Sequence, residues 1–231
     1  MPEPLDPSLV AEVSAVYGYY AALAPRLDPA HGLGGLLLYA GQLGAETTPL
    51  LRAANIAGAA SLAVSHVPDD LKQAQRNGVI DFLVTSLDEA LRILKNEIRK
   101  RQPVSVAISA APLDIGSQML ARGVQPGLLA ATFIEPPAAR AAFLERGASL
   151  VEPVQAASFH IWPIPAAWNA RIPQLDAQLI QLLPDDDAAR RWLRLSPRYL
   201  GRNARRLRSA ACNPETAQQI AALLATSPHS V

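Results

Sequence analysis

The sequence has a single cysteine, Cys212, among its 231 residues. One thiol excludes an internal disulfide and a zinc site built from cysteines alone, and it predicts a reduced, cytoplasmic protein. Charged residues are also few, at 18% of the chain, and the formal net charge is only +1. This balance provides no overall attraction to nucleic acid or to an anionic membrane, so we expect neither as a partner.

Long apolar runs are missing as well. No window reaches the roughly 18 uninterrupted apolar residues of a membrane span, and the first ten residues lack the pattern of a signal peptide. The four histidines are dispersed without ligand spacing, and no nucleophile elbow or phosphate-binding Walker loop is present. We therefore expect no metal site and assign no catalytic residue.

What the chain does contain is a regular alternation of apolar segments. Half of its residues are apolar, and short apolar runs without polar alternation are separated by segments with helical spacing. This pattern predicts an α/β fold, a doubly wound and mostly parallel sheet of about six strands covered on both faces. The expected strands are 36–41, 61–65, 80–85, 104–109, 128–134 and 149–152, with 161–164 as a candidate seventh.

The helical segments suggest how the chain is divided. Residues 1–30 are expected to form an N-terminal helical lead-in, and residues 31–165 the sheet domain. From residue 166 onward the pattern is helical, with Asn213 as the cap of a final helix over 214–225. We expect residues 166–231 to form a helical C-terminal extension packed on the sheet domain, with Trp162 and Trp168 as its anchors.

Four segments carry a family resemblance. The run Tyr39–Ala59 passes from a strand through a glycine-containing turn into an alanine-rich helix, and SLAVSH (61–66), TSLDEAL (85–91) and RGVQPG (122–127) follow in order. In this order and spacing they resemble the central dinucleotide-binding domain of urocanase (urocanate hydratase), over about residues 20–135. The resemblance implies a Rossmann-like fold and an NAD cofactor.

Several positions depart from the family's pattern. The urocanase turn is crowded with glycines that let backbone N–H groups approach a pyrophosphate, whereas Ala45, Glu46 and Thr47 stand here. Ser65 replaces a glutamate expected to hold the ribose hydroxyls. Ala111-Pro112 replaces an Asn-Ala pair, and the family's histidine and glutamine after the fifth strand are replaced within 131–137. The cofactor is therefore unknown, because NAD is implied only by resemblance and its contacts are largely lost.

The family's catalytic cysteine belongs to a second domain. Cys212 lies outside the matched region in an unrelated context, so that role is not transferred to it. Together with the altered cofactor positions, this predicts a protein without urocanate hydratase activity.

Polar residues nevertheless gather where the predicted strands end. Ligands of doubly wound sheets bind beyond the carboxyl ends of the strands, and these residues predict a crevice for a small-molecule or nucleotide-like ligand. Serine and threonine also occupy such positions simply as helix caps, as Ser86 is expected to do. The crevice residues are Gly41, Gln42, Gly44, Ala45, Glu46, Thr47, Ser65, Ser109 and Thr132.

The segment 190–208 contains eight arginines and no acidic residue. It could grip phosphate or nucleic acid, with Trp192 and Tyr199 for stacking. The other interpretation is an amphipathic helix that buries Trp192 and its neighbouring leucines while the arginines pair with Asp185–Asp187 or with a second subunit. The neutral composition favours the second interpretation. It leaves an alternative function, a non-catalytic interaction protein that forms a homodimer or partner contact through this segment.

Overall fold

The computed structural model describes residues 5–132, 136–185, 187–201 and 206–226. Its contacts divide the chain into two compact units, one of residues 18–154 and one of residues 1–17 together with 155–231. The change of unit falls about ten residues before the boundary expected near 165, because the strand at 159–163 pairs with a strand near the C-terminus. The packing of the C-terminal extension on the sheet domain stays a prediction.

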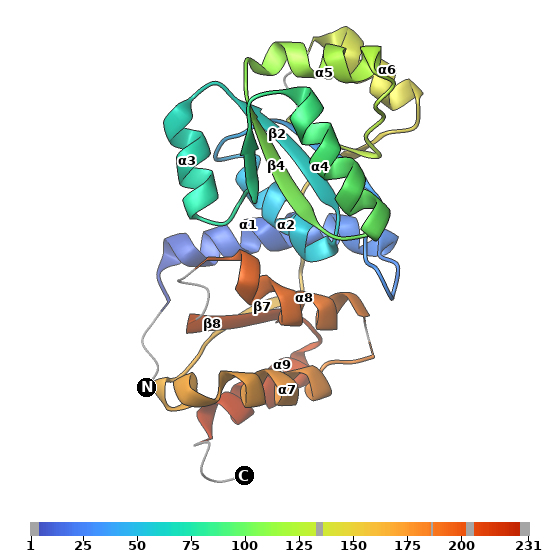
Figure 1. Ribbon diagram of the computed structural model, residues 1–231. Coiled ribbons are helices and arrows are strands. Elements are labelled where there is room, and N and C mark those ends of the chain that lie inside the picture. The colour runs from blue at the N-terminus through green and yellow to red at the C-terminus, as the bar shows by residue number, and fades with distance from the viewer. Residues whose placement is uncertain (1–4, 133–135, 186, 202–205, 227–231) are drawn as a thin grey trace. The chain divides into compact units, whose positions relative to one another are not determined.

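The unit of residues 18–154 contains a six-stranded sheet in the order β3-β4-β2-β1-β5-β6, and every neighbouring pair is parallel. The predicted α/β doubly wound fold is thereby confirmed (Figure 1). The strands are β1 (Leu37–Gln42), β2 (Ala60–Ser65), β3 (Phe82–Val84), β4 (Val104–Ser109), β5 (Leu128–Ala130) and β6 (Ser149–Val151).

Helices connect these strands and cover both faces of the sheet. Right-handed crossovers place α2 and α3 on one face and α4, α5 and α6 on the other, and α5 contacts both α4 and α6. The helices are α2 (Thr48–Ala57), α3 (Pro68–Arg76), α4 (Leu87–Lys100), α5 (Pro112–Ala121) and α6 (Pro137–Glu145). The long helix α1 (Pro7–Leu23) and the short η1 (Ala24–Arg26) precede the sheet.

The central strands are buried on both faces, as their apolar runs predict. All six residues of β2 are buried, including the polar Ser61. Ser61 Oγ donates to Ser105 Oγ at 2.9 Å, and Ser105 Oγ donates to Asn55 Oδ1 at 2.8 Å. This chain joins β2, β4 and α2, so the buried hydroxyl groups do not lose their hydrogen bonds in the core.

A close backbone approach fixes the amino end of the sheet. A Cβ on Gly34 would lie 2.7 Å from the carbonyl oxygen of Arg101 and 2.9 Å from its Cβ, so only glycine fits there. Arg101 follows α4 and has φ +57°. This is the left-handed region, which residues other than glycine, asparagine and aspartate rarely adopt. The sequence thus places an arginine where a helix usually ends in glycine.

We predict that Arg101→Gly stabilises the protein by about 1 kcal/mol, because it removes the strain of a left-handed non-glycine residue. Lys100→Gly, one residue earlier and inside α4, is the matched control and should destabilise by about 0.5–1 kcal/mol. Urea unfolding followed by far-UV circular dichroism measures both. An Arg101→Gly midpoint at or below that of the wild type would contradict the explanation.

The second unit is built around a two-stranded antiparallel sheet of β7 (Phe159–Pro163) and β8 (Leu207–Ala211). Around these strands lie η2 (Ala166–Arg171), α7 (Ile172–Leu182), α8 (Asp187–Tyr199) and α9 (Pro214–Ala225). Figure 1 shows the strands between α8 on one side and α7 with α9 on the other. Asn213 caps α9 as predicted, since its side chain accepts a hydrogen bond from the Thr216 N–H at 2.8 Å.

Two expectations about this part of the chain were wrong. The C-terminal extension is not all helical, because residues 207–211 form β8. The candidate strand at 161–164 is not a seventh strand of the large sheet, because it pairs with β8 in a separate one.

Adjacent residues of β8 point to opposite faces of the small sheet. Arg208 forms a two-pronged ion pair with Asp176 of α7, with nitrogen–oxygen distances of 2.6 and 3.0 Å. Ser209 Oγ accepts a hydrogen bond from Trp192 Nε1 of α8 at 3.1 Å. Each face is therefore attached to a different helix by a buried polar contact, and Trp168 lies in the apolar core of the same unit.

Candidate functional site

The strand order of the large sheet fixes where a ligand crevice can open. The chain leaves β1 for β2 on one side, and it later enters β5 on the other side of β1. In doubly wound sheets this reversal leaves a crevice beyond the carboxyl ends of the two strands. Gln42, the last residue of β1, and Thr132, two residues beyond β5, lie at these ends, and both are exposed.

The turn that follows β1 begins with a distortion of the strand. The register between β1 and β2 shifts between Tyr39 and Gly41, and Gly41 has φ +69°, a conformation for which glycine is the natural residue. The shift redirects the chain into the turn that leads to α2. Gly41 itself is buried, so its role in the structure is to shape the crevice edge.

Two threonine hydroxyl groups close this turn on itself. Thr47 Oγ1 accepts a hydrogen bond from the Gly44 N–H at 3.0 Å and donates one to the Gln42 carbonyl at 2.8 Å. Thr48 contacts the Gly44 carbonyl twice, through its N–H at 3.0 Å and its hydroxyl at 2.8 Å. Pro49 follows in the first turn of α2 and has no N–H to offer.

This closure limits what the turn can bind. A pyrophosphate at a helix N-terminus is held by free backbone N–H groups, and those of Gly44 and Thr48 already have partners. Glu46 is exposed at the same turn and adds a negative charge. The geometry therefore disfavours two adjacent phosphates at this position.

The two serines of the expected crevice differ in accessibility. Ser65 and Ser109 end the neighbouring strands β2 and β4 and are paired in register. Ser65 is fully buried, and its Oγ accepts a hydrogen bond from the Val67 N–H at 3.1 Å. Ser109 is exposed. A ligand can reach the Ser109 hydroxyl directly, whereas Ser65 supports the loop behind it.

The start of α5 contributes an apolar edge. Ala111 precedes the helix without a side-chain cap, and Pro112 is its first residue. The next residue, Leu113, is 57% exposed. Of the positions that depart from the urocanase pattern after β5, 133–135 lie outside the described residues. The exposed polar residues at the carboxyl edge of the described sheet include Gln42, Glu46, Ser109 and Thr132.

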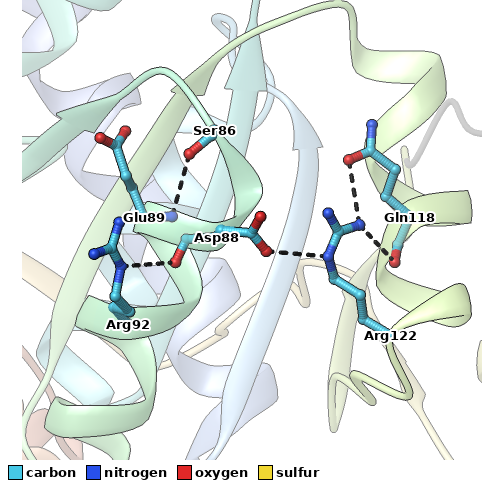
Figure 2. Close-up of polar contacts among 6 residues, drawn as sticks. All are labelled: Ser86, Asp88, Glu89, Arg92, Gln118 and Arg122. Carbon is cyan, nitrogen blue, oxygen red and sulfur yellow. Dashed lines mark hydrogen bonds and ion pairs between the residues drawn. The ribbon is translucent and has the colours of Figure 1, made fainter.

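Figure 2 shows polar contacts made by two of the segments quoted above, TSLDEAL (85–91) and RGVQPG (122–127). Ser86 caps α4 as predicted, since its Oγ accepts a hydrogen bond from the Glu89 N–H at 3.3 Å. In the same turn Asp88 Oδ1 accepts a hydrogen bond from Arg122 Nε at 3.1 Å. TSLDEAL and RGVQPG therefore meet through one ion pair, although 34 residues separate its two members.

The contact between these segments could not be read from the sequence. Arg122 is also held by the Gln118 side chain and carbonyl, each at 3.4 Å from its Nη1, while Arg92 Nε donates to the Asp88 carbonyl (Figure 2). These groups connect the start of α4 to the end of α5. The ion pair between Asp88 and Arg122 thus joins the two segments within the framework of the sheet unit.

Through Glu89, the free energy of unfolding of this unit is expected to depend on pH. Its carboxylate accepts hydrogen bonds from the Thr85 N–H at 3.1 Å and the Thr85 hydroxyl at 3.2 Å. The backbone bond is the main reason that the pKa of Glu89 is lowered. A lowered folded-state pKa stabilises the protein above the carboxyl group's unfolded-state pKa, and this stabilisation is lost as the pH falls through the folded-state pKa.

We accordingly expect Glu89→Gln to be less stable than the wild type at neutral pH and to approach it as the solution is acidified. Urea unfolding at a series of pH values from 7 downward measures the difference. A difference that stays constant, or that grows on acidification, would show that the charged form of Glu89 is not the stabilising one.

The site also contains a residue that the sequence did not single out. Tyr19 of α1 is 9% exposed, and burial raises the pKa of its phenol. The negative charges of Glu46 and Glu152 raise that pKa further. Tyr19 therefore lies near two carboxylates that follow different strands, β1 and β6. No sequence motif joins these three residues, because only the fold brings them together.

Two arginines and the tryptophan of the arginine-rich segment form contacts inside their own unit. Arg208 is 3% exposed and paired with Asp176, and Arg190 pairs with Asp185. Trp192 is fully buried, where its ring packs edge-on against Tyr17 and Phe159. This agrees with the amphipathic interpretation and removes Trp192 from any stacking surface. Arg202 and Arg205 lie outside the described residues.

Other kinds of site find no support in the described part of the chain. No group of three or more histidine, cysteine, aspartate or glutamate residues there could hold a metal ion. None of the helices described is long and apolar enough to span a membrane. Cys212 is buried, and burial raises the pKa of its thiol, so it lacks the exposed thiolate that a nucleophile needs.

A parallel, doubly wound sheet whose strand order reverses beside a glycine-containing strand-to-helix turn defines the class of Rossmann-like domains. Residues 19–132 match the family model of the urocanase Rossmann-like domain. This part of the chain therefore matches a urocanase Rossmann-like domain, and the resemblance inferred over about residues 20–135 is confirmed. The match ends at Thr132, so it contains all nine predicted crevice residues.

Proposed function

We propose that this urocanase-like Rossmann domain binds a small-molecule or nucleotide-like ligand at the carboxyl ends of its strands and lacks urocanate hydratase activity. The observation that carries the proposal is the exposed polar edge on both sides of the strand reversal, formed by Gln42, Glu46, Ser109 and Thr132. A small set of polar groups around a crevice is the usual design of a ligand site. A reducing, cytoplasmic location remains part of the proposal.

The turn after β1 favours a ligand with little negative charge. The Gly44 and Thr48 N–H groups are already bonded, and Glu46 repels phosphate. We therefore expect adenosine, which has no phosphate, to bind more tightly than AMP, NAD or NADH. Replacing Glu46 with glutamine should narrow that difference, because it removes a charge without changing the backbone.

Isothermal titration calorimetry with adenosine, AMP, NAD, NADH and urocanate tests the binding proposal. At least one of the five should bind saturably, and Ser109→Ala with Thr132→Val should weaken it about tenfold, the worth of one or two hydrogen bonds. Ser117→Ala, an exposed serine on α5, is the matched control. Binding of none of these compounds would refute the proposal.

The proposed lack of hydratase activity needs a separate assay. The buried, raised-pKa Cys212 and the closed turn both argue against the family's reaction. We expect the protein to leave urocanate unchanged in the presence of NAD, as followed by urocanate absorbance. Turnover that increases with protein concentration would contradict this part of the proposal.

One observation favours an interaction role as a second candidate function. Arg194 and Arg198 lie one turn apart on α8 and are exposed, and no acidic residue occurs between positions 188 and 214. We propose that they contact a second copy of the chain or an acidic partner. Light scattering of Arg194→Gln with Arg198→Gln tests the homodimer, since an assembly unchanged by both substitutions would exclude these residues from its interface.

A further inference from the structure

A second hollow lies within the sheet unit, beside α1 and β6. Its volume is about 390 Å³, within the range of small-molecule sites. Ala22 and Leu23 of α1, Arg26 of η1, and the segment Leu150–Glu152 line it. None of these residues belongs to the crevice residues predicted from the sequence, so the inference does not require a ligand in the crevice.

Helical spacing explains why one side of α1 forms a wall of this cavity. Tyr19 and Leu23 stand at positions i and i+4 on one face of α1, and Arg26 follows Leu23 by one turn of the 3₁₀ helix η1. The four α-helical and three 3₁₀ steps from Tyr19 to Arg26 correspond to about 12 Å along the axis. Leu23 lies between them and is almost fully buried, and Val151 is similarly buried on the strand side. The cavity thus has an apolar middle.

Its charged groups are of opposite sign. Arg26 and Glu152 both line the cavity and are exposed, and neither forms an ion pair with another residue that the structure describes. They are thus available to a ligand. Glu152 also raises the pKa of the Tyr19 phenol, as Glu46 does, so negative charge gathers around Tyr19.

This arrangement matches a ligand with a charge at each end. A carboxylate beside Arg26 would form a charge-assisted pair, and an ammonium beside Glu152 would relieve the crowding of negative charge around Tyr19. A methylene chain would cover Leu23 and Val151. A dianion would face Glu46 and Glu152, and a dication would face Arg26, so neither fits as well.

We propose that this cavity binds a small zwitterion, an ω-amino acid in chemical class, with its carboxylate on Arg26 and its ammonium on Glu152. Because Leu23 and Val151 also line the cavity, a ligand with methylene groups between its two charges fits better than an α-amino acid, whose two charges are adjacent. The probe is therefore 6-aminohexanoate, with hexylamine and hexanoate as probes that each keep one of its two charges.

Calorimetric titration of the whole protein tests the proposal. We expect 6-aminohexanoate to bind at least about tenfold more tightly than hexylamine or hexanoate, because each charge-assisted contact is worth more than a neutral one. Arg26→Gln should reduce its affinity to that of hexylamine, and Glu152→Gln to that of hexanoate. Arg26→Lys should keep part of the affinity, because the charge remains.

Arg146→Gln and Glu145→Gln at the end of α6 remove the same charges from exposed positions elsewhere and should leave binding unchanged. The proposal is overturned if 6-aminohexanoate does not bind saturably, or if the three probes bind equally. It is also overturned if the control variants lose as much affinity as Arg26→Gln and Glu152→Gln. Ser109→Ala with Thr132→Val should not affect this titration, which separates the cavity from the crevice.

Discussion

Trp192→Ala is expected to destabilise the C-terminal unit by about 4 kcal/mol, near the middle of the range for truncating a buried tryptophan. The ring is fully buried, packs edge-on against Tyr17 and Phe159, and donates a hydrogen bond to Ser209. Trp192→Phe keeps most of the packing and loses the hydrogen bond, so it should cost much less.

Tryptophan fluorescence during urea unfolding measures this loss of stability in the C-terminal unit itself. All three tryptophans, Trp162, Trp168 and Trp192, belong to this unit, and two of them remain as reporters in the variant. Arg194→Ala on the exposed side of α8 is the control, with an expected change within about 0.5 kcal/mol. A loss below about 1 kcal/mol for Trp192→Ala would contradict a core role.

Asp176→Ala should cost about 3 kcal/mol, because it leaves the guanidinium group of Arg208 buried without its carboxylate. Arg208 is 3% exposed, and both oxygens of Asp176 contact it. Asp176 itself is partly exposed, so water reaches the pair from one side and keeps the cost at the lower end of the range for buried pairs.

A double-mutant cycle distinguishes the loss of the ion pair from the cost of leaving the Arg208 charge buried and unpaired. Arg208→Met combined with Asp176→Ala should be more stable than Asp176→Ala alone, since the double variant has no unpaired charge. Asp185→Ala, which removes a 92% exposed partner of Arg190, should change stability by less than about 1 kcal/mol. Equal stabilities of Asp176→Ala and the double variant would mean that the charge of Arg208 is not the cause.

Much of the sheet unit could be predicted from the sequence because its signals are local. Continuous apolar runs mark the buried strands, and Ser86 with Glu89 marks the start of α4. The bounds of β4 and α9 match those expected. Strand order could not be predicted, because it depends on which apolar faces pair after the chain has folded.

The C-terminal unit shows where local signals fail. Residues 207–211 lie at the end of an arginine-rich run, and the sequence gives no sign that Arg208 is buried. Its partner, Asp176, is 32 residues earlier, and the partner strand β7 is about 50 residues earlier. Both contacts are non-local, so a pattern read along the chain predicts a helical surface there.

The sequence predicted which residues lie at the carboxyl edge of the sheet, but not their burial or their hydrogen bonds. Parallel strands necessarily gather their ends at one edge, so Gln42, Ser109 and Thr132 were expected there. The sequence could not show that Ser65 is buried or that Thr47 closes the turn, because each depends on hydrogen bonds formed after folding. Tyr19 was missed for the same reason.

The most direct test of the central claim is a nuclear magnetic resonance titration of ¹⁵N-labelled protein with adenosine. A ligand at the carboxyl edge should shift the amide signals of Gly44, Glu46, Ser109 and Thr132 saturably and leave those of the small β7–β8 sheet unchanged. The account would be contradicted if adenosine shifts none of these four signals, or if the saturable shifts fall in the C-terminal unit instead.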